Sequence, residues 1–159
     1  MPKMLIAYYS RGGNTRKMAE LVHAGAAAAN GVQVDLKPIA EVEPGSLLGY
    51  DAIVLGSPTY YGLPAAELKR LLDDSVALHG QLEGKVGGAF ASSANIGGGN
   101  ETTILAILQA LLIHGMVVPG VPMGDHYGPV AIGAPDRRAG TQCREYGKRL
   151  AAITKKLHG

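Results

Sequence analysis

The residues best suited to chemistry stand in three short segments, each of which follows an apolar run. Residues 10–15 are rich in glycine and polar side chains, residues 60 and 61 are adjacent tyrosines, and residues 97–99 are glycines. A glycine-containing turn before a helix offers free backbone N–H groups, which bind phosphate. Tyrosine rings suit a planar heteroaromatic ligand, and bare backbone lets a ring edge come close. Together the segments indicate a site for a phosphorylated, planar ligand.

Each of these features also has an ordinary structural explanation. The first segment lacks the Walker spacing and the GxGxxG dinucleotide pattern, so it also fits a simple capped turn. One or both tyrosines would otherwise cover the edge of the core. Asn100 or Thr102 would cap a following helix, although three glycines exceed what a cap needs. His114 is a candidate proton donor because imidazole titrates near neutral pH, and it equally fits a helix C-terminus.

Five apolar runs that alternate with helical patterns predict an α/β fold, in which helices cover both faces of a parallel sheet. Helical periodicity follows Thr15, Pro64 and Asn100, and a final amphipathic helix covers residues 138–157. Ligands of such folds bind at the carboxyl ends of the strands, where the three segments fall. The predicted strands cover residues 4–9, 32–36, 52–57, 85–92 and 116–118.

Length and composition exclude several classes of protein. The 159 residues suit a single domain over 1–159. A net charge of +2 is too small for a polybasic surface that binds nucleic acid. Cys143 is the only cysteine, so no intramolecular disulfide forms, and no apolar run reaches the roughly 18 residues of a membrane span. We therefore expect a cytoplasmic protein with neither nucleic acid nor membrane as a partner.

Four motifs occur along the chain: Tyr-Tyr-Ser-x-x-Gly-Asn-Thr from Tyr8, Gly-Ser-Pro-Thr-Tyr-Tyr-Gly from Gly56, Ser-Ser-x-x-x-Gly-Gly-Gly from Ser92, and His-Gly-Met-Val from His114. They resemble the flavodoxin-like flavoproteins, and within these the WrbA, or type IV NAD(P)H:quinone oxidoreductase, family. The likeness covers nearly the whole chain, which would be a short member. The resemblance implies a three-layer, doubly wound, five-stranded parallel sheet in the order 2-1-3-4-5, the order known for flavodoxin.

The resemblance implies FMN as the cofactor and NAD(P)H as a co-substrate. The FMN phosphate would bind to the first segment, at Ser10, Arg11, Gly12, Gly13, Asn14 and Thr15. The ring and the ribityl chain would lie against Pro58, Thr59, Tyr60, Tyr61 and Gly62. The pyrimidine side of the ring would contact Ser93, Ala94, Asn95, Ile96, Gly97 and Gly98. His114 would lie near the ring as the catalytic residue.

The implied activity is a ping-pong transfer of two electrons from NAD(P)H to a quinone-like small molecule, carried out by a homo-oligomer that is a dimer or a tetramer. Two other functions stay open: a flavodoxin-type one-electron carrier and a non-enzymatic FMN-binding module. Carriers dock through complementary charge and are typically acidic, which disfavours the first of these. The apolar residues 103–113 are either buried core or a subunit interface. The family's long insertion before the third strand is absent from this chain.

Overall fold

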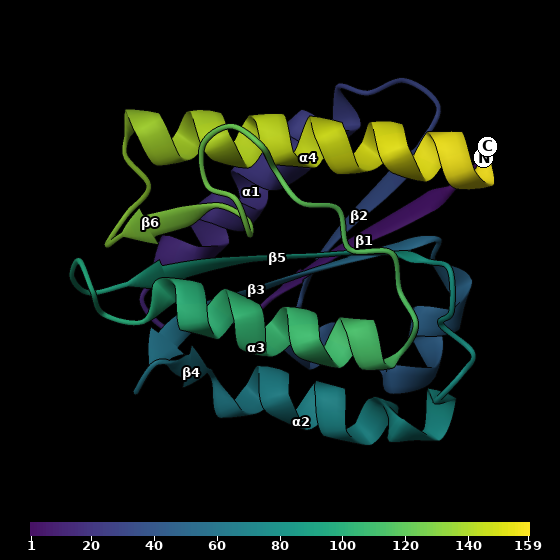
Figure 1. Ribbon diagram of the computed structural model, residues 1–159, viewed down its shortest axis with the longest axis horizontal. Coiled ribbons are helices and arrows are strands. Elements are labelled where there is room, and N and C mark those ends of the chain that lie inside the picture. Colours follow the sequence, from purple (N-terminus) through teal and green to yellow (C-terminus); the bar gives the residue numbers. More distant parts are fainter.

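A computed structural model describes residues 1–159 as three layers, with a parallel sheet between two layers of helices (Figure 1). The five parallel strands are adjacent in the order β2-β1-β3-β5-β6, and a two-residue strand, β4, pairs antiparallel with the end of β3. The predicted doubly wound α/β fold and the order of its five parallel strands are therefore confirmed. The strands are β1 (Lys3–Tyr8), β2 (Gln33–Pro38), β3 (Ala52–Tyr60), β4 (Leu63–Pro64), β5 (Val86–Ser93) and β6 (Val130–Ile132).

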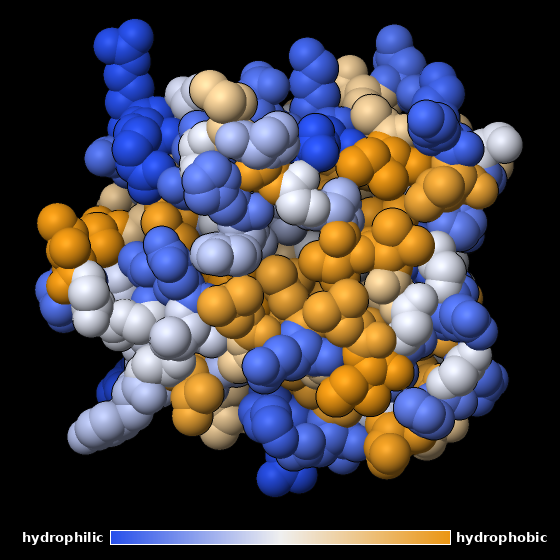
Figure 2. Space-filling view, in the orientation of Figure 1, coloured by the Kyte–Doolittle hydropathy of each residue, from blue (hydrophilic) through white to orange (hydrophobic).

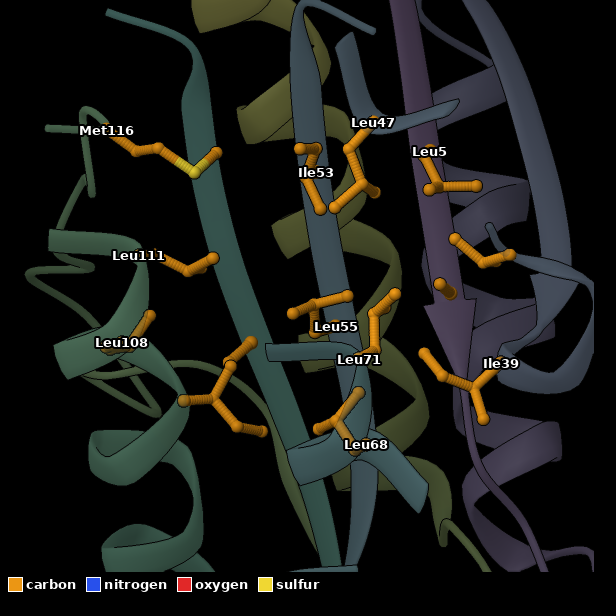
Figure 3. Close-up of a cluster of buried hydrophobic side chains, with 14 of the residues drawn as sticks. Leu5, Ile39, Leu47, Ile53, Leu55, Leu68, Leu71, Leu108, Leu111 and Met116 are labelled. Carbon is orange, nitrogen blue, oxygen red and sulfur yellow. The ribbon is translucent and has the colours of Figure 1, made fainter. Parts of the chain in front are cut away.

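Helices cover both faces of the sheet, which explains why the strands are continuous apolar runs rather than alternating ones. In β1, Met4 and Ile6 pack in the cluster beside α1 and α4, whereas Leu5 packs beside α2 and α3, in the cluster that Figure 3 shows. Crossing a membrane would require a longer or more apolar helix than any in this fold. The helices are α1 (Asn14–Ala27), α2 (Ala66–Asp74), α3 (Asn100–Ile113) and α4 (Arg137–His158), with 3-10 turns η1 (Ile39–Glu41), η2 (Pro44–Gly49) and η3 (Ser75–Leu78).

The prediction of a fifth strand at residues 116–118 is wrong. Val117 makes only an isolated parallel bridge to Val86, and the sheet is completed instead by β6, which pairs with Ala91–Ser93 of β5. Pro119 and Pro122 follow Val117 closely, and proline has no N–H group with which to continue a ladder. The edge position of the sheet is therefore shared between two segments, joined by a loop over residues 118–129.

This divided edge leaves the middle of β5 without a partner strand on the side opposite β3. The backbone N–H of Ala89 donates there to the hydroxyl oxygen of Tyr146, on α4, at 3.2 Å. Burial raises the pKa of Tyr146 to about 12, so the hydroxyl stays neutral. Gly128 closes the gap from the loop side, because a Cβ at this residue would lie 2.0 Å from the Ala89 carbonyl oxygen. A buried N–H group is thereby satisfied without a strand.

Some of the glycines serve helix packing rather than the candidate site. A Cβ at Gly25 of α1 would lie 2.0 Å from the carbonyl oxygen of Arg144, and a Cβ at Gly147 of α4 would lie 2.0 Å from that of Val22. Each helix thus offers a glycine where the backbone of the other approaches. The close packing of α1 on α4 depends on this reciprocal contact.

Candidate functional site

The three segments singled out in the sequence lie at one edge of the sheet, where β1, β3 and β5 end beside one another (left side of Figure 1). The first loop follows β1 and covers residues 9–13. The second loop is the turn between β3 and β4, at residues 60–63. The third loop follows β5 and covers residues 94–99. Their convergence follows from the strand order, because β1 and β5 are both neighbours of β3.

The first loop leaves the start of α1 free to bind an anion. The N-cap residue, Gly13, has a φ of 96° and makes no side-chain capping bond. The N–H of Gly13 donates to the Ser10 hydroxyl oxygen at 3.0 Å. The N–H of Lys17 donates to the Gly13 carbonyl oxygen and is the first in the helix to have a backbone acceptor. The N–H groups of the first turn are therefore available to a ligand. The alternative explanation of this loop, a turn in which a side chain caps the helix, therefore does not hold, because no side chain caps α1.

Thr15 differs from the rest of the first segment because its side chain points into the protein. It is buried, and its hydroxyl lies 2.9 Å from the Ser92 hydroxyl near the end of β5. The side chain thus joins the first loop to the start of the third instead of facing solvent. Ser92 was not among the expected ligand residues, and a buried serine in an apolar strand carries no sequence signal for this contact.

The second loop is a tight hairpin that displays a tyrosine. Tyr60 pairs with Leu63, and the two residues between them have φ values of 51° (Tyr61) and 75° (Gly62), as in a type I′ turn. Tyr61 is fully exposed, so it does not cover the core, whereas Tyr60 is partly exposed at 39%. Next to the turn, the Thr59 hydroxyl is buried and has no hydrogen-bond partner. The turn therefore presents one free ring and lies beside an unsatisfied polar atom.

The third loop is organised by its own polar side chains. Ser93 donates its hydroxyl to the Asn95 carbonyl oxygen at 3.1 Å and accepts from the Asn100 side-chain amide at 3.1 Å. The N–H of Gly98 also donates to the Asn95 carbonyl at 3.1 Å. Residues 94–97 are exposed. The side chains are thus used within the loop, and the exposed backbone is what remains to contact a ligand.

A cleft of about 1470 Å³ borders the first loop but is separate from the space between the second and third loops. Its walls come from residues 8–13, from residues 38–44 between β2 and η2, and from α2, and neither Tyr60 nor Tyr61 lines it. The connection from β2 to β3 contains only 3-10 turns, so it adds no α-helix to the face of the sheet on which α2 and α3 pack. No group of three or more metal-ligating side chains forms anywhere in the structure.

The structure does not bring His114 to the three loops. His114 is the C-cap of α3, whose first turn adjoins the third loop. A helix of 14 residues spans about 21 Å, so His114 lies at the opposite edge of the sheet, near the beginning of β5. Within one chain His114 is therefore a helix length away from the third loop, because helices run antiparallel to the strands that they follow; its place beside a bound ring stays a prediction.

The contacts of His114 instead make it a structural residue. Ser75 Oγ donates to the Leu72 carbonyl oxygen at 2.7 Å and lies 2.8 Å from His114 Nε2. Since the hydroxyl has one proton, Nε2 must carry the imidazole proton and donate to Ser75. Nδ1 is then an unprotonated nitrogen that is buried without a partner. Burial lowers the pKa of His114, and the neighbouring His79 lowers it further.

We expect this histidine to make the fold sensitive to acid. Between the lowered folded-state pKa and the unfolded value near 6.5, the unfolded chain binds more protons, so the free energy of unfolding falls as the pH falls through this range. Urea denaturation of the wild type between pH 5 and about pH 8 measures this loss, which should be reduced in His114→Gln. His126→Gln, in an exposed loop, is the control. Equal pH dependence in all three proteins would contradict the assignment.

Known proteins with similar sequences and structures agree with this geometry. The family model of the NADPH-dependent FMN reductases matches residues 45–128. A flavodoxin of Aquifex aeolicus is 42% identical, with 95% of this chain and 86% of that protein covered. An NAD(P)H dehydrogenase (quinone) of Chromohalobacter salexigens is 34% identical over the whole of both chains. The crystal structure of a WrbA-like flavodoxin from Agrobacterium tumefaciens superposes with a TM-score of 0.82 at 26% identity, covering 99% of each chain. This chain belongs to the flavodoxin-like flavoproteins, in the family of the WrbA-like proteins and NAD(P)H dehydrogenases (quinone).

Proposed function

We propose that residues 1–159 form a single FMN-binding domain that transfers two electrons from NAD(P)H to quinones. The observation that carries the proposal is the meeting of an uncapped helix start, an exposed tyrosine turn and a bare backbone loop at one edge of the sheet. Relatives that are 31–40% identical and are named NAD(P)H dehydrogenase (quinone) support the choice of substrates.

The residues present fit FMN. The first-turn N–H groups of α1 would hold the phosphate, together with the Ser10 hydroxyl, whose proton is still free because its oxygen accepts from Gly13. Arg11 is exposed, makes no ion pair and adds positive charge beside this loop. The unsatisfied Thr59 hydroxyl lies on the strand end that leads into the tyrosine turn. Thr15 would act indirectly, by fixing the loop through Ser92.

The ring would lie between the second and third loops. When bound, FMN supplies the redox chemistry, since it accepts two electrons and returns them to a second substrate. The chain contributes a stacking surface at Tyr60 and Tyr61 and backbone groups at residues 94–98 that orient the ring edge. Because His114 lies at the other edge of the sheet, we assign it no proton transfer within one chain.

A one-electron carrier is the second candidate function. It is favoured by the 42% identity with the flavodoxin of Aquifex aeolicus. The net charge of +2 opposes it, because docking of a carrier on protein partners relies on a strong complementary charge. The two functions differ in one measurable property: only the enzyme reacts directly with a nicotinamide nucleotide.

Anaerobic mixing with NADH or NADPH distinguishes the two functions. We expect the visible absorbance of protein-bound FMN to be lost with at least one nucleotide and to return when a quinone is added. A ping-pong cycle would give parallel lines in double-reciprocal plots at several quinone concentrations. Riboflavin, which lacks the phosphate, should bind more weakly than FMN. Persistence of the absorbance with both nucleotides would refute the oxidoreductase function.

Tyr61 offers a test of the stacking surface that does not endanger the fold. Asparagine adopts positive φ more readily than tyrosine, and the exposed ring makes no core contact, so Tyr61→Asn should retain or increase thermal stability. FMN should bind about two- to tenfold more weakly, because a ring–ring contact contributes about 0.5–1.5 kcal/mol. Tyr61→Phe, which retains the ring, is the control. Unchanged FMN affinity in Tyr61→Asn would exclude this ring from the site.

We further propose that the chain forms a homo-oligomer through its α2–α3 face. Leu105, Leu112 and Ile113 of α3 and Val76 of η3 are exposed, and Figure 2 shows an apolar patch across this face. The inner side of α3 is buried, so the helix is apolar on both sides.

Light scattering should give a mass of at least two chains, and Leu112→Lys should lower it. A monomeric wild type at micromolar concentration would contradict the proposal. The cytoplasmic location stays a prediction.

A further inference from the structure

Thr102, in the first turn of α3, contacts both of the loops between which the ring would lie. Its hydroxyl donates to the Gly62 carbonyl oxygen in the second loop at 2.7 Å, and the Gly99 carbonyl oxygen at the end of the third loop lies 2.9 Å away. The sequence offers only a capping role for this residue. The structure adds a contact to a residue 40 positions earlier in the chain.

The backbones of the two loops touch at the same place. A Cβ at Gly99 would lie 2.6 Å from the Gly62 Cα and 3.4 Å from the Thr59 Cγ2. Both glycines have positive φ, 75° at Gly62 and 95° at Gly99. The tyrosine turn and the third loop therefore approach each other closely beside Thr102, and the hydroxyl of this residue bridges the contact.

The two acceptors of Thr102 make the bridge reversible. A hydroxyl group has one proton, so it donates fully to Gly62 or to Gly99, not to both. The Gly99 acceptor is local to the first helical turn, three residues back, so it stays within reach of the hydroxyl wherever the second loop lies. Release of Gly62 therefore leaves no donor without a partner, which keeps the free-energy cost of opening small.

We propose that Thr102 is a positioning residue that holds the second loop, the turn at residues 60–63, against the third loop and thereby sets the space for the flavin ring. The role of the ring rests on the proposed function. The link is exposed, unlike the buried contact of Thr15 with Ser92 that holds the first loop. The turn is therefore the part of the site that opens, while the phosphate loop stays in place.

Hydrogen exchange of the flavin-free protein tests this role directly. In Thr102→Val, which keeps the shape but lacks the donor, the backbone amides of residues 60–65 should exchange about two- to tenfold faster than in the wild type. The amides of residues 10–17 should be unchanged. The Thr102→Ser variant keeps the hydroxyl and should restore the wild-type rate at residues 60–65.

Thr103→Val is the matched control. The Thr103 hydroxyl is buried in the same helical turn but has no hydrogen-bond partner, so its removal should alter neither exchange nor binding. Binding of flavins gives the second readout. FMN and riboflavin should both lose affinity for Thr102→Val by a similar factor, because they share the ring and differ in the phosphate.

Wild-type exchange at residues 60–65 in Thr102→Val would overturn the positioning role, as would equal acceleration of residues 10–17. An affinity loss confined to FMN would also overturn it, because it would implicate the phosphate loop. A wild-type protein that binds no flavin would refute the proposed function instead. The exchange measurement needs no flavin, so the two failures are distinguishable.

Discussion

Close packing along β5 is the constraint on which the position of the whole site depends. The strand is buried throughout, and α3 and α4 pack on its two faces. Gly88 leaves room for the side chains of α4, because a Cβ there would lie 2.7 Å from both Leu150 Cδ1 and Tyr146 Oη, and on the α3 side a Cβ at Gly87 would lie 3.1 Å from Leu111 Cδ1. Packing on both faces fixes the register of β5 against β3 and therefore the position of its carboxyl end. Ser92 near its end then anchors the first loop, and the third loop begins where the strand stops.

The strands and the convergence of the three loops are predictable because they depend on patterns that involve few residues. Apolar runs covered on both faces are unambiguous, and the signals of glycine and polar side chains stand directly at their ends. The fifth strand is the exception. Residues 116–118 have the composition of a strand, but Pro119 and Pro122 stop the ladder, and the true partner of β5 is the short segment Val130–Ile132. A three-residue strand within a loop has too little periodicity to be recognised.

The direction of individual side chains is not predictable from these patterns. Thr15 stands in a polar loop motif, yet its hydroxyl is buried against Ser92, a partner 77 residues away. The contact of Thr102 with Gly62 spans 40 residues and exists only because two glycine backbones meet. His114 follows the third loop by the 14 residues of α3, so within one chain it lies a helix length away from that loop. Each of these properties arises from tertiary packing, on which local spacing carries no information.

The hydrogen bonds that hold the two halves of the proposed site differ in burial, which would affect ligand binding. The first loop, which is the proposed phosphate site, is held by the buried contact between the Thr15 and Ser92 hydroxyls, so its N–H groups would be oriented before any ligand arrives. The second and third loops, which form the proposed ring site, are joined by the exposed hydrogen bond from Thr102 to Gly62. The Thr102 hydroxyl has an alternative acceptor at Gly99. Under the proposed function, a phosphorylated ligand would bind first at the first loop while the tyrosine turn is open, and the turn would enclose the ring afterwards. In this order of events the phosphate would supply affinity early, because the first loop needs no reorganisation, and the turn would supply selectivity for a planar ring.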